Sequence, residues 1–221
     1  MKLNEQTQQV TEAFIAAQTE EVKKDIMDAF EALAQSEVAK NALNTGEKAI
    51  DFTLSNATGV KISLSTLLDK GPVVLSFYRG GWCPFCNLEF KALHDKLPRM
   101  KELGATLIGV SPETPDTSTI TVENHKLEFE VLSDIGNKIA DAYGLVMTLS
   151  ESMRPHYQEW GFDLPKFNGD DSYQLPVPAT YIIDSNGVVT ACFINKDYTQ
   201  RMEPDDIILA LESLQTQTVS S

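Results

Sequence analysis

Residues 72–86, PVVLSFYRGGWCPFC, decide the expected fold of this chain. The first seven are almost all apolar or β-branched, which is typical of a strand buried on both faces of a sheet. Arg79-Gly80-Gly81 ends the strand, and Pro84 suits the first turn of a helix, where its missing N–H would have no partner. The stretch therefore predicts a central strand, a tight loop and a helix that begins beside two cysteines.

Strands and helices alternate on both sides of this unit. A hairpin (51–54 with 60–63) and one helical turn (65–68) are expected before it. After it we expect strands at 106–111, 129–132, 180–183 and 188–194, and helices at 84–97, 115–125, 137–143 and 204–214. This alternation predicts an α/β fold with a central mixed, mostly parallel sheet flanked by helices.

Two segments fall outside the alternation. Residues 1–45 form an N-terminal helical extension, with helices expected at 4–17 and 19–39, before a domain of residues 46–221. These helices are expected to cover a sheet or to form the contact of a homodimer. Residues 149–176 have no regular pattern, and we interpret them as an insertion over the rim of the sheet, before the last strands.

The composition limits which binding partners and which cellular compartment are expected. The chain has 221 residues, and its 18 basic and 32 acidic side chains give a formal charge of −14. Such a chain is repelled by phosphate backbones and by anionic headgroups, so neither nucleic acid nor a membrane is an expected partner. No signal segment or long apolar window is apparent, so a cytoplasmic protein is expected.

Cys83 and Cys86 are the residues expected to carry chemistry. Unpaired amides and the positive end of the helix dipole at the start of a helix stabilise a thiolate at Cys83. Thiols at the first position of such motifs have pKa values of ~3.5 to ~7. Cys86 lies one helical turn further on and can form a disulfide with little backbone movement. Cys83 is therefore the expected attacking thiol, and Cys86 the resolving thiol.

Two other interpretations of the pair stay open at this point. A CxxC motif can be half of a zinc or iron–sulfur site, but such sites need about four ligands and no second pair is present. Alternatively both cysteines are inert core residues of a scaffold. The third cysteine, Cys192, lies in an apolar strand and is expected to serve packing.

A proline precedes the strand at 180–183, in the stretch LPVPATYIID of residues 175–184. In thioredoxin-like folds a cis proline at this place faces the cysteine pair and leaves backbone groups free for an extended partner. Pro178 is therefore expected to support the site.

Four segments together resemble a known family: FYRGGWCPFCN at 77–87, SPE at 111–113, LSD at 132–134 and PATYIID at 178–184. They are similar to the CxxC-type, peroxiredoxin-like branch of the alkyl hydroperoxide reductase and thiol-specific antioxidant superfamily. The resemblance implies a thioredoxin fold without a cofactor. It also implies reduction of hydrogen peroxide or organic hydroperoxides, with thioredoxin or a similar dithiol as reductant. Cys83 falls on the peroxidatic position and Cys86 on the second cysteine.

The sequence departs from typical peroxiredoxins at three positions. A proline and a threonine or serine, seven and three residues before the peroxidatic cysteine, are replaced by Ser76 and Gly80, and an arginine before the later strand is replaced by Pro178. The loop before Cys83 is also closer in length to that of thioredoxin. These departures favour an alternative function, a thiol–disulfide oxidoreductase with little peroxidase activity.

Other residues are expected to compensate for these losses. Arg79 or Arg201 would supply positive charge, and the amides of Gly81 and Trp82 would replace the hydroxyl donor. The alternative for Arg201 is a solvated charge on the surface or at a helix entry.

Overall fold

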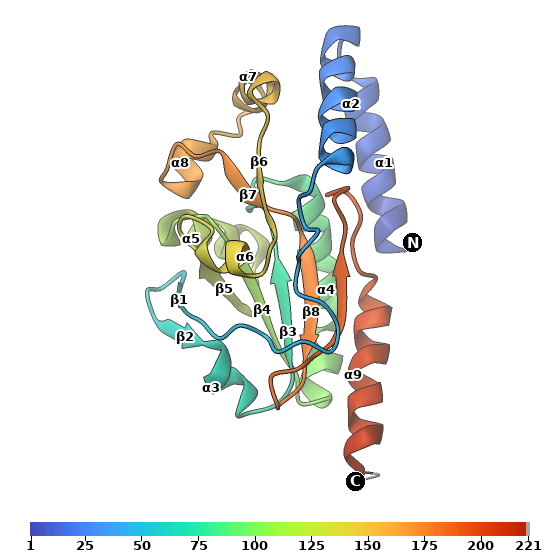
Figure 1. Cartoon of the computed structure of the whole chain (residues 1–221), viewed down its shortest axis with the longest axis vertical. Helices are drawn as coiled ribbons and strands as arrows, with labels where there is room; N and C mark the ends of the chain where they lie inside the picture. Colours follow the sequence, from blue (N-terminus) through green and yellow to red (C-terminus); the bar gives the residue numbers. More distant parts are fainter. Residues whose placement is uncertain (220–221) are drawn as a thin grey trace.

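A seven-stranded sheet forms the centre of the protein in the computed structural model, which describes residues 1–219 (Figure 1). The strands of this sheet lie in the order β2-β1-β5-β4-β3-β8-β9. Their bounds are β1 (Thr53–Asn56), β2 (Lys61–Ser63), β3 (Val73–Phe77), β4 (Thr106–Ser111), β5 (Glu130–Ser133), β8 (Ala179–Ile183) and β9 (Val189–Ile194). A thioredoxin-like α/β architecture is thereby confirmed.

The expectation of a mostly parallel sheet is wrong. Only the β3–β4 and β4–β5 pairs are parallel, whereas β1–β2, β1–β5, β3–β8 and β8–β9 are antiparallel. Short turns within the β1–β2 and β8–β9 hairpins account for two of the antiparallel pairs. Each hairpin also joins the parallel centre through an antiparallel pair, β1–β5 or β3–β8.

Alternate residues of β3 define the two faces of the sheet. Val73, Leu75 and Phe77 belong to one buried cluster, and Val74 belongs with Tyr78 to the other. The second cluster contains both cysteines of the CxxC motif. Residues of α3 (Leu64–Leu68) and α6 (Lys138–Ala142) pack in the first cluster, and those of α4 (Pro84–Glu102) and α9 (Pro204–Val219) in the second. The helix α5 (Pro115–His125) contacts β5.

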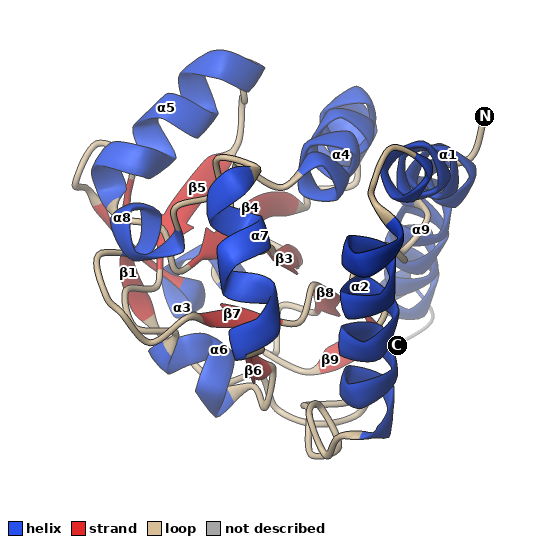
Figure 2. Cartoon of the chain, turned by 90° about the horizontal axis from the view of Figure 1, so that it is seen from above, coloured by secondary structure: helices blue, strands red, loops and turns tan. Residues whose placement is uncertain are grey.

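The N-terminal extension covers two different parts of the chain. Its first helix, α1 (Leu3–Ala16), packs against α4, and its second, α2 (Glu20–Gln35), contacts the segment that was expected to be an irregular insertion (Figure 2). The extension thus packs mainly on a helix and on the inserted segment, whereas one of the two alternatives predicted that it covers a sheet. Its role in a homodimer stays a prediction.

The insertion is regular, contrary to expectation. It contains the 3₁₀ turn η1 (Glu151–Met153), the helices α7 (Arg154–Glu159) and α8 (Leu164–Asn168), and β7 (Gln174–Pro176), which pairs with β6 (Val146–Thr148). The elements are three to six residues long, too short for a hydrophobic period to show in the sequence. They close a third apolar cluster against α2.

Within residues 1–219, no helix has both the length and the apolar character needed to cross a membrane.

A remote carboxylate holds the start of α1. Both oxygens of Glu203 accept the backbone N–H groups of Leu3 and Asn4, each at 3.0 Å. Glu203→Gln removes the negative charge and one of these acceptors, so we expect the free energy of unfolding to fall by about 1 kcal/mol in chemical denaturation. The control Glu212→Gln, which breaks an exposed pair with Arg99, should cost less than about 0.5 kcal/mol. Equal stability of the two variants would contradict this role of Glu203.

Candidate active site

Cys83 occupies the N-cap position of α4, directly after the loop that leaves β3. Its side chain and that of Cys86 are both fully buried, and both cysteines are free thiols. Pro84, between them, is exposed. The structure thus confirms the strand–loop–helix unit, and it places the two sulfurs beneath a surface residue.

Two glycines shape the loop before Cys83. Gly80 has φ +148°, and a Cβ there would lie 2.2 Å from Nε1 of the Trp82 indole. A Cβ at Gly81 would lie 2.0 Å from Oγ1 of Thr121. A side chain at either position would clash with Trp82 or Thr121, so the loop packs closely against these two residues.

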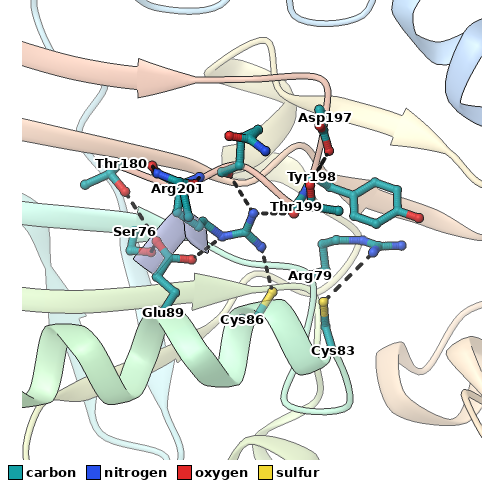
Figure 3. Close-up of polar contacts among 12 residues, drawn as sticks. Ser76, Arg79, Cys83, Cys86, Glu89, Thr180, Asp197, Tyr198, Thr199 and Arg201 are labelled. Atoms are coloured by element: carbon teal, nitrogen blue, oxygen red, sulfur yellow. Dashed lines mark hydrogen bonds and ion pairs between the residues drawn. The ribbon is translucent and has the colours of Figure 1, made fainter. Parts of the chain in front are cut away.

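Arg79 is buried among aromatic rings and faces Cys83 (Figure 3). Its guanidinium carbon lies 4.0 Å from the ring centre of Tyr198, 5.1 Å from that of Trp82 and 5.7 Å from that of Tyr157. Nη2 donates to the hydroxyl of Tyr157, and Nη1 donates to Sγ of Cys83 at 3.9 Å. Among the described residues no carboxylate pairs with Arg79, and its side-chain acceptors are the Tyr157 hydroxyl and the sulfur of Cys83.

These contacts make Cys83 acidic. Burial opposes ionisation, but the hydrogen bond from the Cys86 thiol and the positive charges of Arg79 and Arg201 outweigh it and lower the pKa of Cys83 to about 6. Most of Cys83 is therefore a thiolate at neutral pH. Burial and the bond to Cys83 have the opposite effect on Cys86, whose pKa is raised.

Arg201 is part of the same site, and its interpretation as a solvated surface charge is wrong. Its side chain is only 2% exposed. Nε donates to Glu89 at 2.6 Å, and Nη2 donates to Sγ of Cys86 at 3.4 Å (Figure 3). Each arginine thus contacts one cysteine: Arg79 contacts Cys83, and Arg201 contacts Cys86.

Glu89 lies one turn after Cys86 on α4 and is also buried. Its Oε1 accepts hydrogen bonds from Ser76 at 3.3 Å and from Thr180 at 3.5 Å. Burial raises the pKa of Glu89, although the charge of Arg201 acts against this shift. The carboxyl group therefore links the central strands to the arginine that contacts Cys86.

A second buried carboxyl group, Glu113, holds the loop from the other side. The Gly81 amide donates to it at 3.1 Å and the Tyr78 hydroxyl at 3.4 Å. Burial raises the pKa of Glu113 to about 7, although these hydrogen bonds favour the carboxylate. Because the Gly81 amide is occupied by Glu113, the expectation that it donates at Cys83 is not met.

The sequence is similar to that of a known protein family. The sequence profile of the AhpC/TSA family matches residues 45–192. The chain belongs to the AhpC/TSA family.

Two relatives of this AhpC/TSA protein are plant enzymes. Chloroplastic peroxiredoxin Q of Sedum lineare is 30% identical over 163 residues, which cover 74% of this chain and 75% of the relative. Chloroplastic peroxiredoxin Q of Arabidopsis thaliana is 32% identical over 154 residues, which cover 70% of this chain and 61% of the relative. The chain is thus a peroxiredoxin-type oxidoreductase, a thiol-dependent peroxidase, and the disulfide-exchange and scaffold alternatives are not favoured.

Solved structures support the fold. Peroxidoxin BcpB from Mycobacterium tuberculosis superposes with a TM-score of 0.61 at 23% identity, over 77% of this chain and 97% of that one. Peroxiredoxin Q from Xanthomonas campestris superposes with a TM-score of 0.57 at 17% identity, over 78% of this chain and 98% of that one.

The structure explains some departures from the AhpC/TSA pattern. Ser76 supports Glu89, and Gly80 leaves space that the Trp82 ring fills. The expectation of a cis bond at Pro178 is wrong, because every peptide bond in residues 1–219 is trans. Pro178 is buried between β7 and β8, where the chain passes from the small sheet to the central one. Cys192 packs at the edge of the first cluster, as expected.

Four residues of the site were missed in the sequence: Glu89, Glu113, Tyr157 and Tyr198. Glu89 had a signal, because it is an acidic residue on the buried side of α4, one turn from Cys86. Glu113 lies in a recognised segment, SPE, but nothing there indicates that its carboxyl is buried. The two tyrosines come from segments whose position over Arg79 depends on tertiary packing alone.

The acidity of Cys83 is predicted to depend on Arg79. In the wild type, the rate at which iodoacetamide alkylates Cys83 should rise with pH, with its midpoint at about pH 6, because the thiolate is the reactive form. Arg79→Met removes the adjacent positive charge and should raise the midpoint by about one unit or more. Peptide mapping by mass spectrometry separates Cys83 from the other cysteines. The exposed control Arg99→Met should leave the midpoint in place, and a similar result for Arg79→Met would contradict the assignment.

Proposed function

We propose that this enzyme reduces hydrogen peroxide and organic hydroperoxides with Cys83 as the attacking thiolate. The contact from Arg79 Nη1 to Cys83 Sγ at 3.9 Å carries the proposal, since it places a buried cation beside the nucleophile. The sulfur attacks the outer peroxide oxygen and the O–O bond breaks. Cys83 becomes a sulfenic acid, and the leaving alkoxide or hydroxide takes a proton from water.

Arg79 stabilises the transition state of this step. Negative charge passes from the sulfur to the leaving oxygen, and a fixed cation beside both atoms lowers the energy of that redistribution. The rings of Tyr198, Trp82 and Tyr157 hold the guanidinium in place before substrate arrives. Typical peroxiredoxins have a hydroxyl group and an arginine that this chain lacks, and Arg79 thereby replaces both.

Cys86 resolves the sulfenic acid. Its thiol attacks the sulfur of Cys83, a disulfide forms, and the hydroxyl leaves with the thiol proton as water. Arg201 Nη2 stabilises the Cys86 sulfur as negative charge develops on it. Both cysteines lie within one turn at the start of α4, so resolution needs no second chain.

Thioredoxin or another dithiol would then reduce the disulfide. Its approach is supported by Pro84, which is exposed between the two buried cysteines. A homodimer and a cytoplasmic location stay predictions from the sequence, and the two plant relatives described above are named as chloroplastic.

Peroxide consumption with defined variants tests the proposal. The reduced protein should consume one equivalent of hydrogen peroxide and form an intramolecular Cys83–Cys86 disulfide, read by mass spectrometry. Cys86→Ser should stop at a Cys83 sulfenic acid that dimedone traps. The matched control Cys192→Ser should behave as the wild type. Fast peroxide consumption by Cys83→Ser would overturn the proposal.

Arg201 is predicted to act in resolution as well as in stability. Arg201→Met leaves Glu89 buried without its partner and should cost about 3–5 kcal/mol of unfolding free energy. The double variant Glu89→Leu with Arg201→Met should recover most of that stability, because an apolar pair can replace a buried ion pair. Disulfide formation in the double variant should still be about 10-fold slower or more, because the charged donor to Cys86 is absent.

Rapid quenching followed by mass spectrometry measures this step separately from attack on peroxide. Arg99→Met, at the exposed end of α4, serves as the control. Resolution at the wild-type rate in the double variant would show that Arg201 serves stability alone.

A further inference from the structure

An apolar cavity of about 200 Å³ lies between α2 and the inserted segment. Ala29 and Leu33 of α2 line one side, and Met147 of β6 and Met153 of η1 line the other. Among the residues that the structure describes, no Asp, Glu, Lys, Arg or His side chain reaches its wall. Most of the lining side chains are apolar, so the cavity suits an apolar ligand.

Two residues of the cavity wall contact Arg79, the side chain that lies beside the reactive sulfur. Tyr157 and Tyr198 line the cavity, and the same two rings lie against the guanidinium of Arg79. Arg79 in turn donates to Cys83, so a single guanidinium group separates the tyrosines of the cavity wall from the nucleophile (Figure 3).

The N-terminal extension is needed to form the cavity. The family profile begins at residue 45, whereas α2 ends at Gln35, so one wall comes from outside the matched region. α2 and α7 lie at the end of the molecule toward which β3 points (Figure 1). They are joined there by His156 Nε2 and Asp25 Oδ2, which lie 2.9 Å apart.

We propose that this cavity binds the apolar group of an organic hydroperoxide whose –OOH group reaches Arg79. The inference rests on the proposed peroxidase function and specifies where the organic group of the substrate binds. A cavity of ~150 Å³ holds benzene, so the volume here is sufficient for a small apolar group. A phenyl or branched alkyl group therefore fits, as in cumene hydroperoxide.

Tyr157 lines the cavity and also contacts Arg79, the residue that donates to the sulfur. Cys83 is fully buried, and the Tyr157 hydroxyl occupies Nη2 of Arg79. The –OOH group can take over this donor when Tyr157 moves away. The tyrosine lies on α7, a helix of six residues in the inserted segment.

Specificity constants for two peroxides test the subsite. In Ala29→Phe a phenyl ring occupies the cavity, so the ratio of kcat/KM for cumene hydroperoxide to that for hydrogen peroxide should fall about 10-fold or more. The matched control Ala34→Phe adds the same ring on the same helix at an exposed residue outside this cavity, and it should keep the wild-type ratio. An unchanged ratio in Ala29→Phe would overturn the subsite.

A binding measurement keeps the subsite separate from the peroxidase function. Cumene, the hydrocarbon without a peroxide group, should raise the thermal midpoint of Cys83→Ser, and should not raise that of Cys83→Ser with Ala29→Phe. If the wild type consumes neither peroxide, the proposed function fails while this binding result still decides the subsite. Should Ala29→Phe not fold, Leu33→Ala enlarges the cavity, and an unchanged preference between cumene and tert-butyl hydroperoxide would contradict the proposal.

Discussion

The contact between the buried guanidinium of Arg79 and the sulfur of Cys83 is the constraint on which the rest of the site depends. A cation without a carboxylate partner is costly in an apolar interior, and here a thiolate and three aromatic rings offset that cost. The same contact keeps Cys83 ionised and places positive charge where peroxide must break. Stability of the folded site and reactivity of the thiol therefore share one interaction.

The other buried charged groups support Cys86 and the loop before Cys83. Arg201 contacts Cys86 and is neutralised by Glu89, so the resolving thiol has a cation beside it without excess charge in the core. Glu113 holds the Gly81 amide on the opposite side of the loop. The two cysteines thus have opposite pKa shifts although they lie on one turn of α4. These opposite shifts suit a reaction in which the Cys83 thiolate attacks first and the Cys86 thiol reacts in the second step.

Local features of the chain were readable from the sequence, and contacts between distant segments were not. The strand at 106–111 and the helix at 115–125 have the expected bounds, because turn residues and caps mark their ends. The CxxC pair was found from spacing alone. The ion pair of Arg201 with Glu89 joins residues 112 positions apart, and only the folded sheet brings them together. Tyr157 was missed for the same reason, in a segment whose elements are too short to show a period.

The rate of reaction between reduced protein and hydrogen peroxide tests the central claim most directly. Stopped-flow measurement at pH 6 should compare the folded protein with the same chain unfolded in urea. A pKa of about 6 alone gives about a tenfold advantage over an ordinary thiol, after its lower nucleophilicity is included. Because Arg79 stabilises the leaving oxygen, we expect the folded protein to exceed the unfolded chain by clearly more than tenfold. Arg79→Met should remove this additional advantage. If the folded protein reacts no more than tenfold faster than the unfolded chain, Arg79 does not stabilise the leaving oxygen. A folded rate that Arg79→Met leaves unchanged would contradict this role as well.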